Sequence, residues 1–190
     1  MIDKLRNYVG GMVEPIARLM VRAGFTANMA SAVGFMFSLV AAHAILSNSL
    51  NLASILILIS GFFDLIDGAI ARVAGRVSKF GSFLDSVIDR YSDATIVISV
   101  ILSRRCDLAI GLIALVGFLM VSYARAKGEM LGVNMAGVGI AERAERLIIL
   151  AIGAFVNALN YAVLLLALLT HITVLMRSYR AWRVLRVDSS

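Results

Sequence analysis

Long apolar blocks, separated by short polar or charged stretches, divide most of this chain into segments of similar length. Six of these blocks have about the 20 residues that an α-helix needs to cross the hydrocarbon core of a bilayer. They cover residues 28–46, 51–73, 83–102, 108–126, 141–157 and 161–179. The pattern therefore predicts an all-α integral membrane protein with six transmembrane helices.

The N-terminal segment has a different pattern, in which basic side chains lie among apolar ones at helical spacing. The apolar set is Ile2, Leu5, Val9, Met12, Val13, Ile16, Leu19 and Met20, and the basic set is Lys4, Arg6, Arg18 and Arg22. A helix of this kind lies in the plane of the membrane interface, where anionic headgroups attract its cations. We expect an amphipathic interfacial helix over residues 2–23, ahead of the first span.

Composition and charge agree with a membrane protein and suggest its orientation. Hydrophobic residues make up 61% of the chain, against about 45–50% in soluble domains, and the mean hydropathy is +0.91. Of the 18 Lys and Arg residues, only Arg104 and Arg105 would lie outside if both termini are cytoplasmic. We predict one domain over residues 1–190 in the plasma membrane, with a cytoplasmic face that suits phosphates and anionic lipids and not nucleic acid.

Four aspartates interrupt the apolar pattern at the cytoplasmic ends of the second and third spans. Asp64 and Asp67 are about 60° apart around one helix, and Asp85 and Asp89 are about 40° apart around the next. The short connection makes these helices antiparallel neighbours, so their acidic stripes can face each other. Carboxylate oxygens suit Mg²⁺ or Mn²⁺, and two such ions could clamp a diphosphate. The alternative is a structural ion-pair network with the nearby cations Arg72, Arg76, Lys79 and Arg90.

These aspartates belong to a longer motif, which resembles the full signature of the CDP-alcohol phosphotransferases, D-x₂-D-G-x₂-A-R-x₈-G-x₃-D-x₃-D. Its fixed positions are Asp64, Asp67, Gly68, Ala71, Arg72, Gly81, Asp85 and Asp89. The resemblance implies that the first two aspartates and Asp85 bind metal, and that Asp89 lies at the edge of the metal site and is the catalytic base. It also implies that Gly68, Ala71 and Arg72 contact cytidine diphosphate. One departure is Ala27-Asn28, which stands where a similar family has Pro-Asn at the start of the first span.

The family resemblance also implies a reaction and an assembly. The reaction is transfer of a lipid phosphate from CDP-diacylglycerol or CDP-archaeol to an alcohol, with release of CMP and no covalent enzyme intermediate. The assembly is a homodimer. Composition does not distinguish between the ester-linked and the ether-linked donor.

A second polar cluster, at the ends of the fourth, fifth and sixth spans, bears on the acceptor alcohol. Its members are Ser122, Arg125, Lys127, Arg143, Arg146 and Arg177. These cations can form a pocket for an acceptor that carries a phosphate. The alternative is positive-inside topology combined with pairing along one helix, such as Glu142 with Arg146.

The sequence Gly-Ile-Ala-Glu-Arg-Ala-Glu-Arg-Leu from residue 139 resembles the branch of the family that uses inositol 1-phosphate. In that branch, basic residues at the positions of the second cluster hold the acceptor phosphate. The choice between Arg143 and Arg146 for this role stays open at this point.

Other functions remain as alternatives. Glycerol 3-phosphate is the nearest competing acceptor, because it would need the same metal site. A membrane prenyltransferase also binds a diphosphate through aspartates and Mg²⁺, and a divalent-ion channel can carry rings of aspartates. Outside the motifs, we expect Asp93 to pair with a neighbouring polar group. We expect close helix packing at Gly111, Gly117, Gly132, Gly137 and Gly153.

Overall fold

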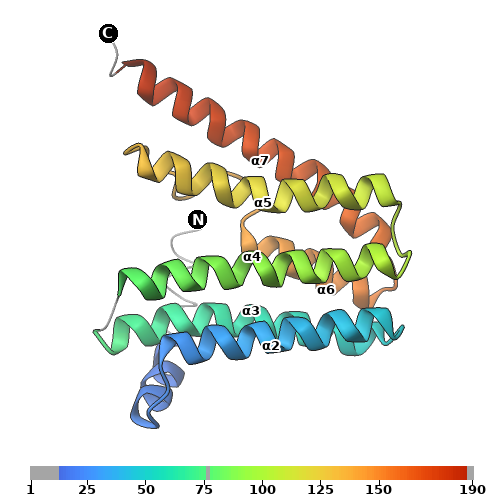
Figure 1. Ribbon diagram of the computed structural model, residues 1–190, viewed down its shortest axis with the longest axis horizontal. Coiled ribbons are helices and arrows are strands. Elements are labelled where there is room, and N and C mark those ends of the chain that lie inside the picture. The colour runs from blue at the N-terminus through green and yellow to red at the C-terminus, as the bar shows by residue number, and fades with distance from the viewer. Residues whose placement is uncertain (1–12, 76–77, 188–190) are drawn as a thin grey trace.

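The computed structural model describes residues 13–75 and 78–187, which form a bundle of helices joined by short connections (Figure 1). The long helices are α2 (Ala27–Leu46), α3 (Leu50–Val73), α4 (Lys79–Leu102), α5 (Leu108–Met130), α6 (Arg143–Phe155) and α7 (Leu159–Val187). Ahead of them, residues 13–22 form a further helix. The all-α prediction is confirmed.

Four of these helices are long and apolar enough to cross a membrane, by length and composition. They are α2, α3, α5 and residues Leu159–Arg186 of α7. The helix α4 is equally long but carries Asp85, Asp89, Arg90 and Asp93. The helix α6 has 13 residues, or about 20 Å at 1.5 Å per residue, and is shorter than the predicted segment 141–157. The chain is therefore a multi-pass membrane protein, with a helix at the position of each of the six predicted spans.

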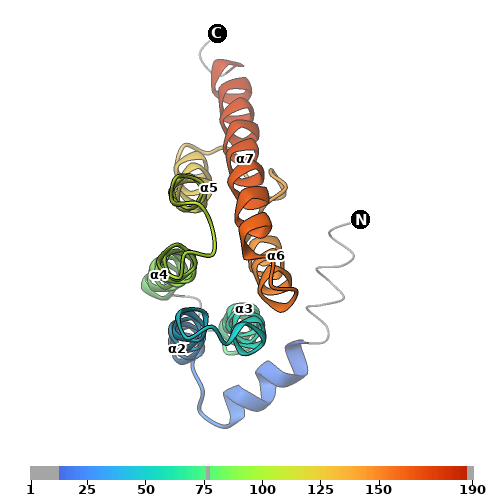
Figure 2. The same cartoon turned by 90° about the vertical axis from the view of Figure 1, so that its right-hand side faces the viewer.

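Successive long helices run in opposite directions, so the bundle has two distinct ends. We call the end at which α3 finishes and α4 begins the polar end, and the opposite end the turn end. The helix α2 packs on α3 and α4, α3 on α6, α4 on α5, and α7 on α5 and α6. Figure 2 shows these helices nearly end-on, with α7 tilted away from the rest.

The helix over residues 13–22 lies crosswise to α2 and α3 at the polar end (Figure 2). Val13 and Ala17 are buried in an apolar cluster with Ala30, Ile66 and Ile70. On its other face, apolar residues such as Leu19 are exposed. Residues 2–12 of the predicted interfacial helix lie outside the described residues.

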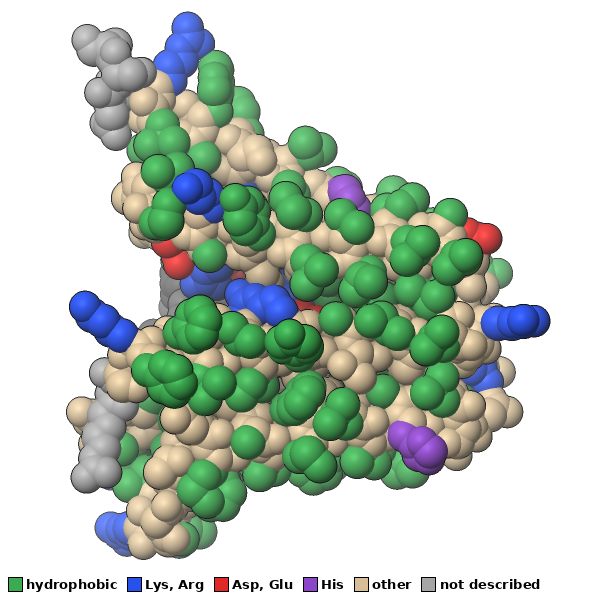
Figure 3. All heavy atoms as spheres, in the orientation of Figure 1, with side chains coloured by type: hydrophobic (Ala, Val, Ile, Leu, Met, Phe, Trp, Pro, Cys, Tyr) green, Lys and Arg blue, Asp and Glu red, His purple; other side chains and the backbone are tan. Residues whose placement is uncertain are grey.

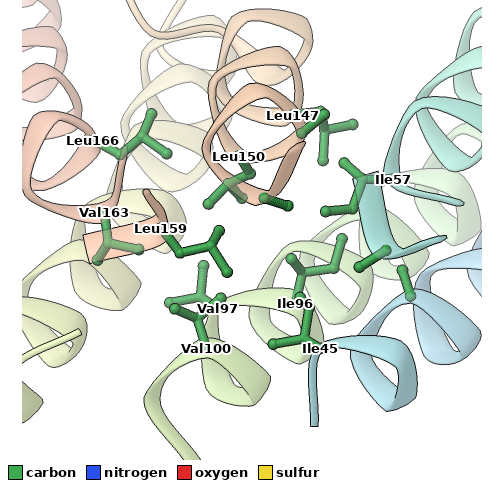
Figure 4. Packing of buried hydrophobic residues seen from close by; sticks show 14 of the residues in the cluster. Ile45, Ile57, Ile96, Val97, Val100, Leu147, Leu150, Leu159, Val163 and Leu166 are labelled. Carbon is green, nitrogen blue, oxygen red and sulfur yellow. The ribbon is translucent and has the colours of Figure 1, made fainter. Parts of the chain in front are cut away.

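All six long helices contribute to the main apolar core, and Figure 4 shows part of it. Ile45, Ile57, Ile96, Leu150 and Val163 meet there, each from a different helix, and all are buried. Within a bilayer such contacts stabilise the bundle through close van der Waals packing, because lipid tails are as apolar as the side chains. This core fixes how the helices are placed and therefore which side chains meet at the polar end.

Polar side chains form N-cap hydrogen bonds at the starts of α2, α4 and α5. The hydroxyl of Thr26 accepts from the Met29 amide at the start of α2, and that of Ser78 accepts from the Gly81 amide at the start of α4. Asp107 accepts from two amides at the start of α5. Each N-cap satisfies amides that have no partner within the first helical turn.

At the turn end, the guanidinium of Arg105 joins the three connections between helices. It donates to the side-chain oxygen of Asn48, between α2 and α3, and at 2.9 Å to that of Asn157, between α6 and α7. Asn48, Asn157 and Arg104 all have φ between 54° and 64°, a left-handed conformation that asparagine tolerates better than most residues. Arg105 therefore ties the loops at this end to one another.

Three of the five glycines expected to serve helix packing do so. A Cβ at Gly117 would lie 2.1 Å from Thr170 Oγ1, one at Gly153 2.5 Å from the Ala162 Cβ, and one at Gly111 2.5 Å from a side-chain carbon of Ile101. For Gly132 and Gly137 the packing prediction is wrong. Both lie in the connection between α5 and α6 with φ of 80° and 70° and nothing within 4 Å of an added Cβ, so they serve turn geometry.

We predict that Gly117→Val separates α5 from α7 and lowers the melting temperature in detergent. Overpacking typically costs about 1–3 kcal/mol, and each kcal/mol shifts the melting temperature of a chain of this size by about 2–4 °C. The matched control is Ala126→Val, because Ala126 lies on the exposed side of the same helix. Equal melting temperatures for the two variants would show that this contact does not hold α5 against α7.

Candidate active site

Three aspartates converge at the polar end, two from α3 and one from α4. One carboxylate oxygen from each of Asp64, Asp67 and Asp85 lies within 4.8 Å of the others. Asp67 is only 6% exposed. The hydroxyl of Ser31, on α2, donates to Asp67 at 2.7 Å and lies 3.4 Å from Asp85, so a third helix supports the pair. The two acidic stripes face each other, as the helical spacing predicts.

The donor set of this cluster fits a hard divalent cation. Three carboxylates this close repel one another, and partial burial removes water that would otherwise screen their charge. Mg²⁺ and Mn²⁺ are bound by carboxylate oxygen, and a divalent charge offsets the repulsion. The three carboxylates therefore have the donors and the charge that a divalent metal ion requires.

Asp89, the predicted base, lies one helical turn after Asp85 on α4. Its carboxylate accepts from Arg143 Nη1 and lies 3.7 Å from Arg90 Nη1. Arg143 also donates to Asp64. Among the described residues, Arg72 and Lys79 form no ion pair with the motif aspartates, and Arg76 lies outside that part of the chain. The ion network that does form therefore depends mainly on Arg143, a residue of α6.

A cleft of about 240 Å³ opens beside Asp67 and Asp85. Gly68, Ala71 and Arg72, which the family resemblance assigns to cytidine diphosphate, all line it. The cleft is also lined by Ala27 and Asn28, where the sequence departs from the Pro-Asn pattern, and by Ser31, Ser78, Gly81 and Ser82. A Cβ at Gly81 would lie 2.9 Å from Ser78 Oγ and 3.3 Å from Asn28 Oδ1, so glycine keeps this wall open.

A second cavity, of about 300 Å³, lies on the other side of the acidic cluster. Its lining includes Asp64, Asp89, Arg90 and Asp93, together with five of the six residues expected to contact the acceptor, which are Ser122, Arg125, Arg143, Arg146 and Arg177. The sixth, Lys127, is exposed and does not line the cavity. Figure 3 shows basic and acidic side chains in a seam between α4 and α5, on a face that is otherwise mostly apolar.

Arg146 is buried beneath this cavity, with 2% of its surface exposed. It donates to Asp93 at 2.7 Å and to the Ala141 carbonyl at 3.2 Å, and its guanidinium lies 4.7 Å from the centre of the Phe118 ring. The pairing expected for Asp93 is thus confirmed. The alternative that Arg146 pairs with Glu142 along α6 is wrong, because burial directs the guanidinium across to α4.

Arg177 is also 2% exposed. Its Nε donates to the Val138 carbonyl at 2.8 Å and its Nη1 to the Val121 carbonyl at 2.6 Å. Its Nη2 lies 3.7 Å from a Glu142 oxygen. Arg177 therefore joins α7 to α5 and to the connection before α6, whereas Arg125 is held only at the surface, by Glu129 on its own helix.

The acidic cluster borders both the cleft and the arginine-lined cavity, among helices long enough to cross a membrane. This arrangement is typical of a membrane enzyme that acts on phosphate compounds. Comparison with known proteins names the class. Residues 25–177 match the family model for CDP-alcohol phosphatidyltransferases. The chain belongs to this family and is a phospholipid-synthesising transferase. Membership excludes the prenyltransferase and ion-channel alternatives.

Relatives of known name are similar along almost the whole chain. The archaetidylinositol phosphate synthase of Pyrococcus horikoshii is 39% identical, over 95% of this chain and 96% of the relative. That of Methanothermobacter thermautotrophicus is 38% identical, over 98% and 96%. Both relatives are named for an inositol phosphate and not for glycerol 3-phosphate.

Solved structures show the same fold. The crystal structure of phosphatidylinositol phosphate synthase from Mycobacterium tuberculosis with CDP-DAG bound gives a TM-score of 0.79 at 31% identity, over 90% of this chain and 93% of that one. The same enzyme in complex with manganese and citrate gives 0.78 at 31% identity, over 90% and 88%.

We predict that Asp67→Asn lowers CMP release at least about a hundredfold, because the variant lacks a charge that holds the metal. The initial rate of CMP release in saturating Mg²⁺ measures this, alongside Mn²⁺ binding followed by electron paramagnetic resonance. The control is Asp107→Asn at the turn end, since asparagine also caps a helix. EDTA should abolish the activity of both the control variant and the wild type. Normal turnover of Asp67→Asn in saturating Mg²⁺ would contradict the metal site.

Proposed function

We propose that this protein transfers the lipid phosphate of CDP-archaeol or CDP-diacylglycerol to inositol 1-phosphate. The observation that carries the proposal is the position of the acidic cluster between two cavities. Asp67 and Asp85 line the cleft with the nucleotide motif, while Asp64 lines the arginine-rich cavity. The names of the similar enzymes support an inositol phosphate in the second cavity.

Each cavity has the chemistry of one substrate. In the first, Arg72 supplies a cation for the diphosphate, and the small residues Gly68 and Ala71 leave room for the nucleotide. In the second, arginines face a space large enough for a sugar phosphate, with the carboxylate of Asp89 at its inner wall. Arginine donors bind phosphate through charge-assisted hydrogen bonds.

The reaction follows from this placement. Asp89 accepts the proton of the acceptor hydroxyl, and the hydroxyl oxygen forms a bond to the phosphorus on the lipid side of the diphosphate. The bond from that phosphorus to the bridging oxygen breaks, and its electron pair leaves with CMP. When bound at Asp64, Asp67 and Asp85, Mg²⁺ or Mn²⁺, as two ions, supplies charge neutralisation for the diphosphate.

We also propose a topology of six spans, with the polar end and both termini in the cytoplasm and the 13–22 helix in the interface. The asymmetry of basic residues supports it, because Arg104 and Arg105 lie at the turn end and the other described Lys and Arg at the polar end. The connection before the short helix α6 is held against α7, because Thr173 Oγ1 accepts from the Ile140 and Ala141 amides. The homodimer implied by the family is part of the same proposal.

We predict that inositol 1-phosphate is consumed far faster than free inositol or glycerol 3-phosphate. We also predict that mutations in the two cavities affect the KM values of different substrates. Arg125→Gln should raise the KM for the acceptor about tenfold or more, because a charge-assisted hydrogen bond contributes about 1.5–3 kcal/mol. It should barely change the KM for the CDP-lipid. Arg72→Gln should do the reverse, and steady-state assays of CMP release measure both.

Two outcomes would contradict the assignment. Equal use of free inositol and its phosphate would show that the second cavity is not a phosphate site. A matching rise of both KM values in each variant would show that the cavities do not hold separate substrates. Preference for glycerol 3-phosphate would change the acceptor but leave the family reaction in place.

The topology predicts opposite accessibility of the two ends. In intact cells, an impermeant maleimide should label Ser49→Cys at the turn end, but Lys79→Cys at the polar end only after permeabilisation. Burial raises the pKa of the Cys106 thiol, so this native cysteine carries less thiolate at neutral pH and should react slowly. Cys106→Ser provides the background control, and the reverse labelling pattern would overturn the orientation.

A further inference from the structure

Arg143 occupies the junction between the acidic cluster and the acceptor cavity. A single guanidinium nitrogen, Nη1, donates both to Asp64 on α3 and to Asp89 on α4. Its Nε lies 3.4 Å from Asp93 Oδ1. The side chain is 15% exposed. A cation in the first turn of α6 is disfavoured by the helix dipole, so these carboxylates, and not the helix, account for its position.

Arg143 therefore competes with a divalent cation for the same carboxylate group, that of Asp64. Asp64 is one of the three carboxylates that converge in the metal cluster, and its Oδ1 is engaged by Arg143 in this structure. A carboxylate oxygen that accepts from a guanidinium is less available to a metal ion. The two cations are thus alternative partners for Asp64. Because the same Nη1 of Arg143 also donates to Asp89, displacing Arg143 from Asp64 also removes this partner from Asp89.

The charges around the cavity show what this exchange would change. Five acidic residues line it, Asp64, Asp89, Asp93, Glu142 and Glu145, against five basic ones, Arg90, Arg125, Arg143, Arg146 and Arg177. This balance gives a phosphate no net attraction. When a metal ion takes Asp64, four acidic residues remain against five arginines, and the cavity gains a net positive charge that favours an anion.

The neighbouring arginines are not free to respond in this way. Arg146 and Arg177 are both buried and donate to backbone carbonyls that a metal would not displace. Within the described part of the chain Arg143 has no bond to a backbone carbonyl, and its partners are Asp64, Asp89 and Asp93. Of the two residues that the sequence leaves as alternatives, Arg143 is the one whose guanidinium can turn to a new ligand.

We propose that Arg143 couples metal binding to acceptor binding. In the metal-free protein it neutralises Asp64 and Asp89, and when a divalent cation binds it is released to the phosphate of the acceptor. The metal ion and the acceptor must then each raise the affinity of the protein for the other by the same factor. This inference rests on the proposed function, since it takes inositol 1-phosphate as the ligand of the cavity.

The test measures binding alone, with no CDP-lipid present. Calorimetry gives the affinity of the purified protein for inositol 1-phosphate with EDTA and with saturating Mn²⁺, and electron paramagnetic resonance gives Mn²⁺ affinity with and without inositol 1-phosphate. For wild type we expect each ligand to raise the affinity of the protein for the other ligand about tenfold or more. For Arg143→Gln we expect Mn²⁺ to bind more tightly than to wild type. We also expect the coupling to fall to less than about threefold, because the residue shared by the two sites has been removed.

Arg125→Gln is the matched control, because this arginine lines the same cavity without contacting the metal cluster. It should weaken inositol 1-phosphate binding but keep the tenfold coupling. Arg143→Lys retains the charge without the planar fork and should show coupling between those of wild type and Arg143→Gln. This variant serves the test if Arg143→Gln does not fold.

Three results would overturn the inference. Coupling that persists undiminished in Arg143→Gln would mean that the phosphate contacts the metal directly. Weaker Mn²⁺ binding in that variant would mean that Arg143 supports the metal site and does not compete for it. Equal affinity of wild type for inositol 1-phosphate with and without metal would remove the coupling while leaving the proposed function intact. If inositol 1-phosphate does not bind wild type at all, the proposed function itself fails.

Discussion

Mutual repulsion among carboxylates is the constraint on which the polar end of this protein depends. Asp64, Asp67 and Asp85 converge within 4.8 Å in a part of the chain surrounded by apolar helices. Charged groups in such surroundings are costly unless a cation offsets them. This fold provides a serine hydroxyl and a guanidinium from a distant helix, and the three carboxylates also suit a divalent ion. The acidic cluster therefore determines which side chains the other helices must bring to this end.

Two buried arginines hold the frame that makes this convergence possible. Arg146 joins α6 to α4 and lies over an aromatic ring of α5, while Arg177 joins α7 to α5 and to the connection before α6. The bond of Arg146 to Asp93 and the bonds of Arg177 to two backbone carbonyls span elements that lie far apart in the sequence. We therefore regard both as residues that shape the acceptor cavity from below, and Arg125 and Arg143 as those that face its contents.

The sequence predicted well whatever depends on local pattern or on a complete motif. Apolar blocks gave most helix boundaries to within a few residues, and the spacing of Asp64, Asp67 and Asp85 gave their convergence. Contacts between distant elements were not predictable in this way. Nothing local reveals that Arg143 crosses to Asp64, that Ser31 supports Asp67, or that Asn28 lines the nucleotide cleft.

The departures from the predicted placement have a common physical cause. The place of Lys127 in the chain predicts that it lies with the other acceptor residues, but its side chain is exposed and does not line the cavity. Gly132 and Gly137 were grouped with packing glycines, but their positive φ values show that they form turns. In each case the residue type was compatible with two roles, and only the three-dimensional path of the backbone distinguishes between them.

The link that Arg105 makes between the connections of the turn end has a mechanical consequence. Helices that are held together at one end separate by rotating about that end. The largest displacement then occurs at the far tips, where α7 already diverges from its neighbours (Figure 1). The acidic cluster lies at the same end of the bundle, so a separation of this kind would widen the space around Asp64, Asp67 and Asp85.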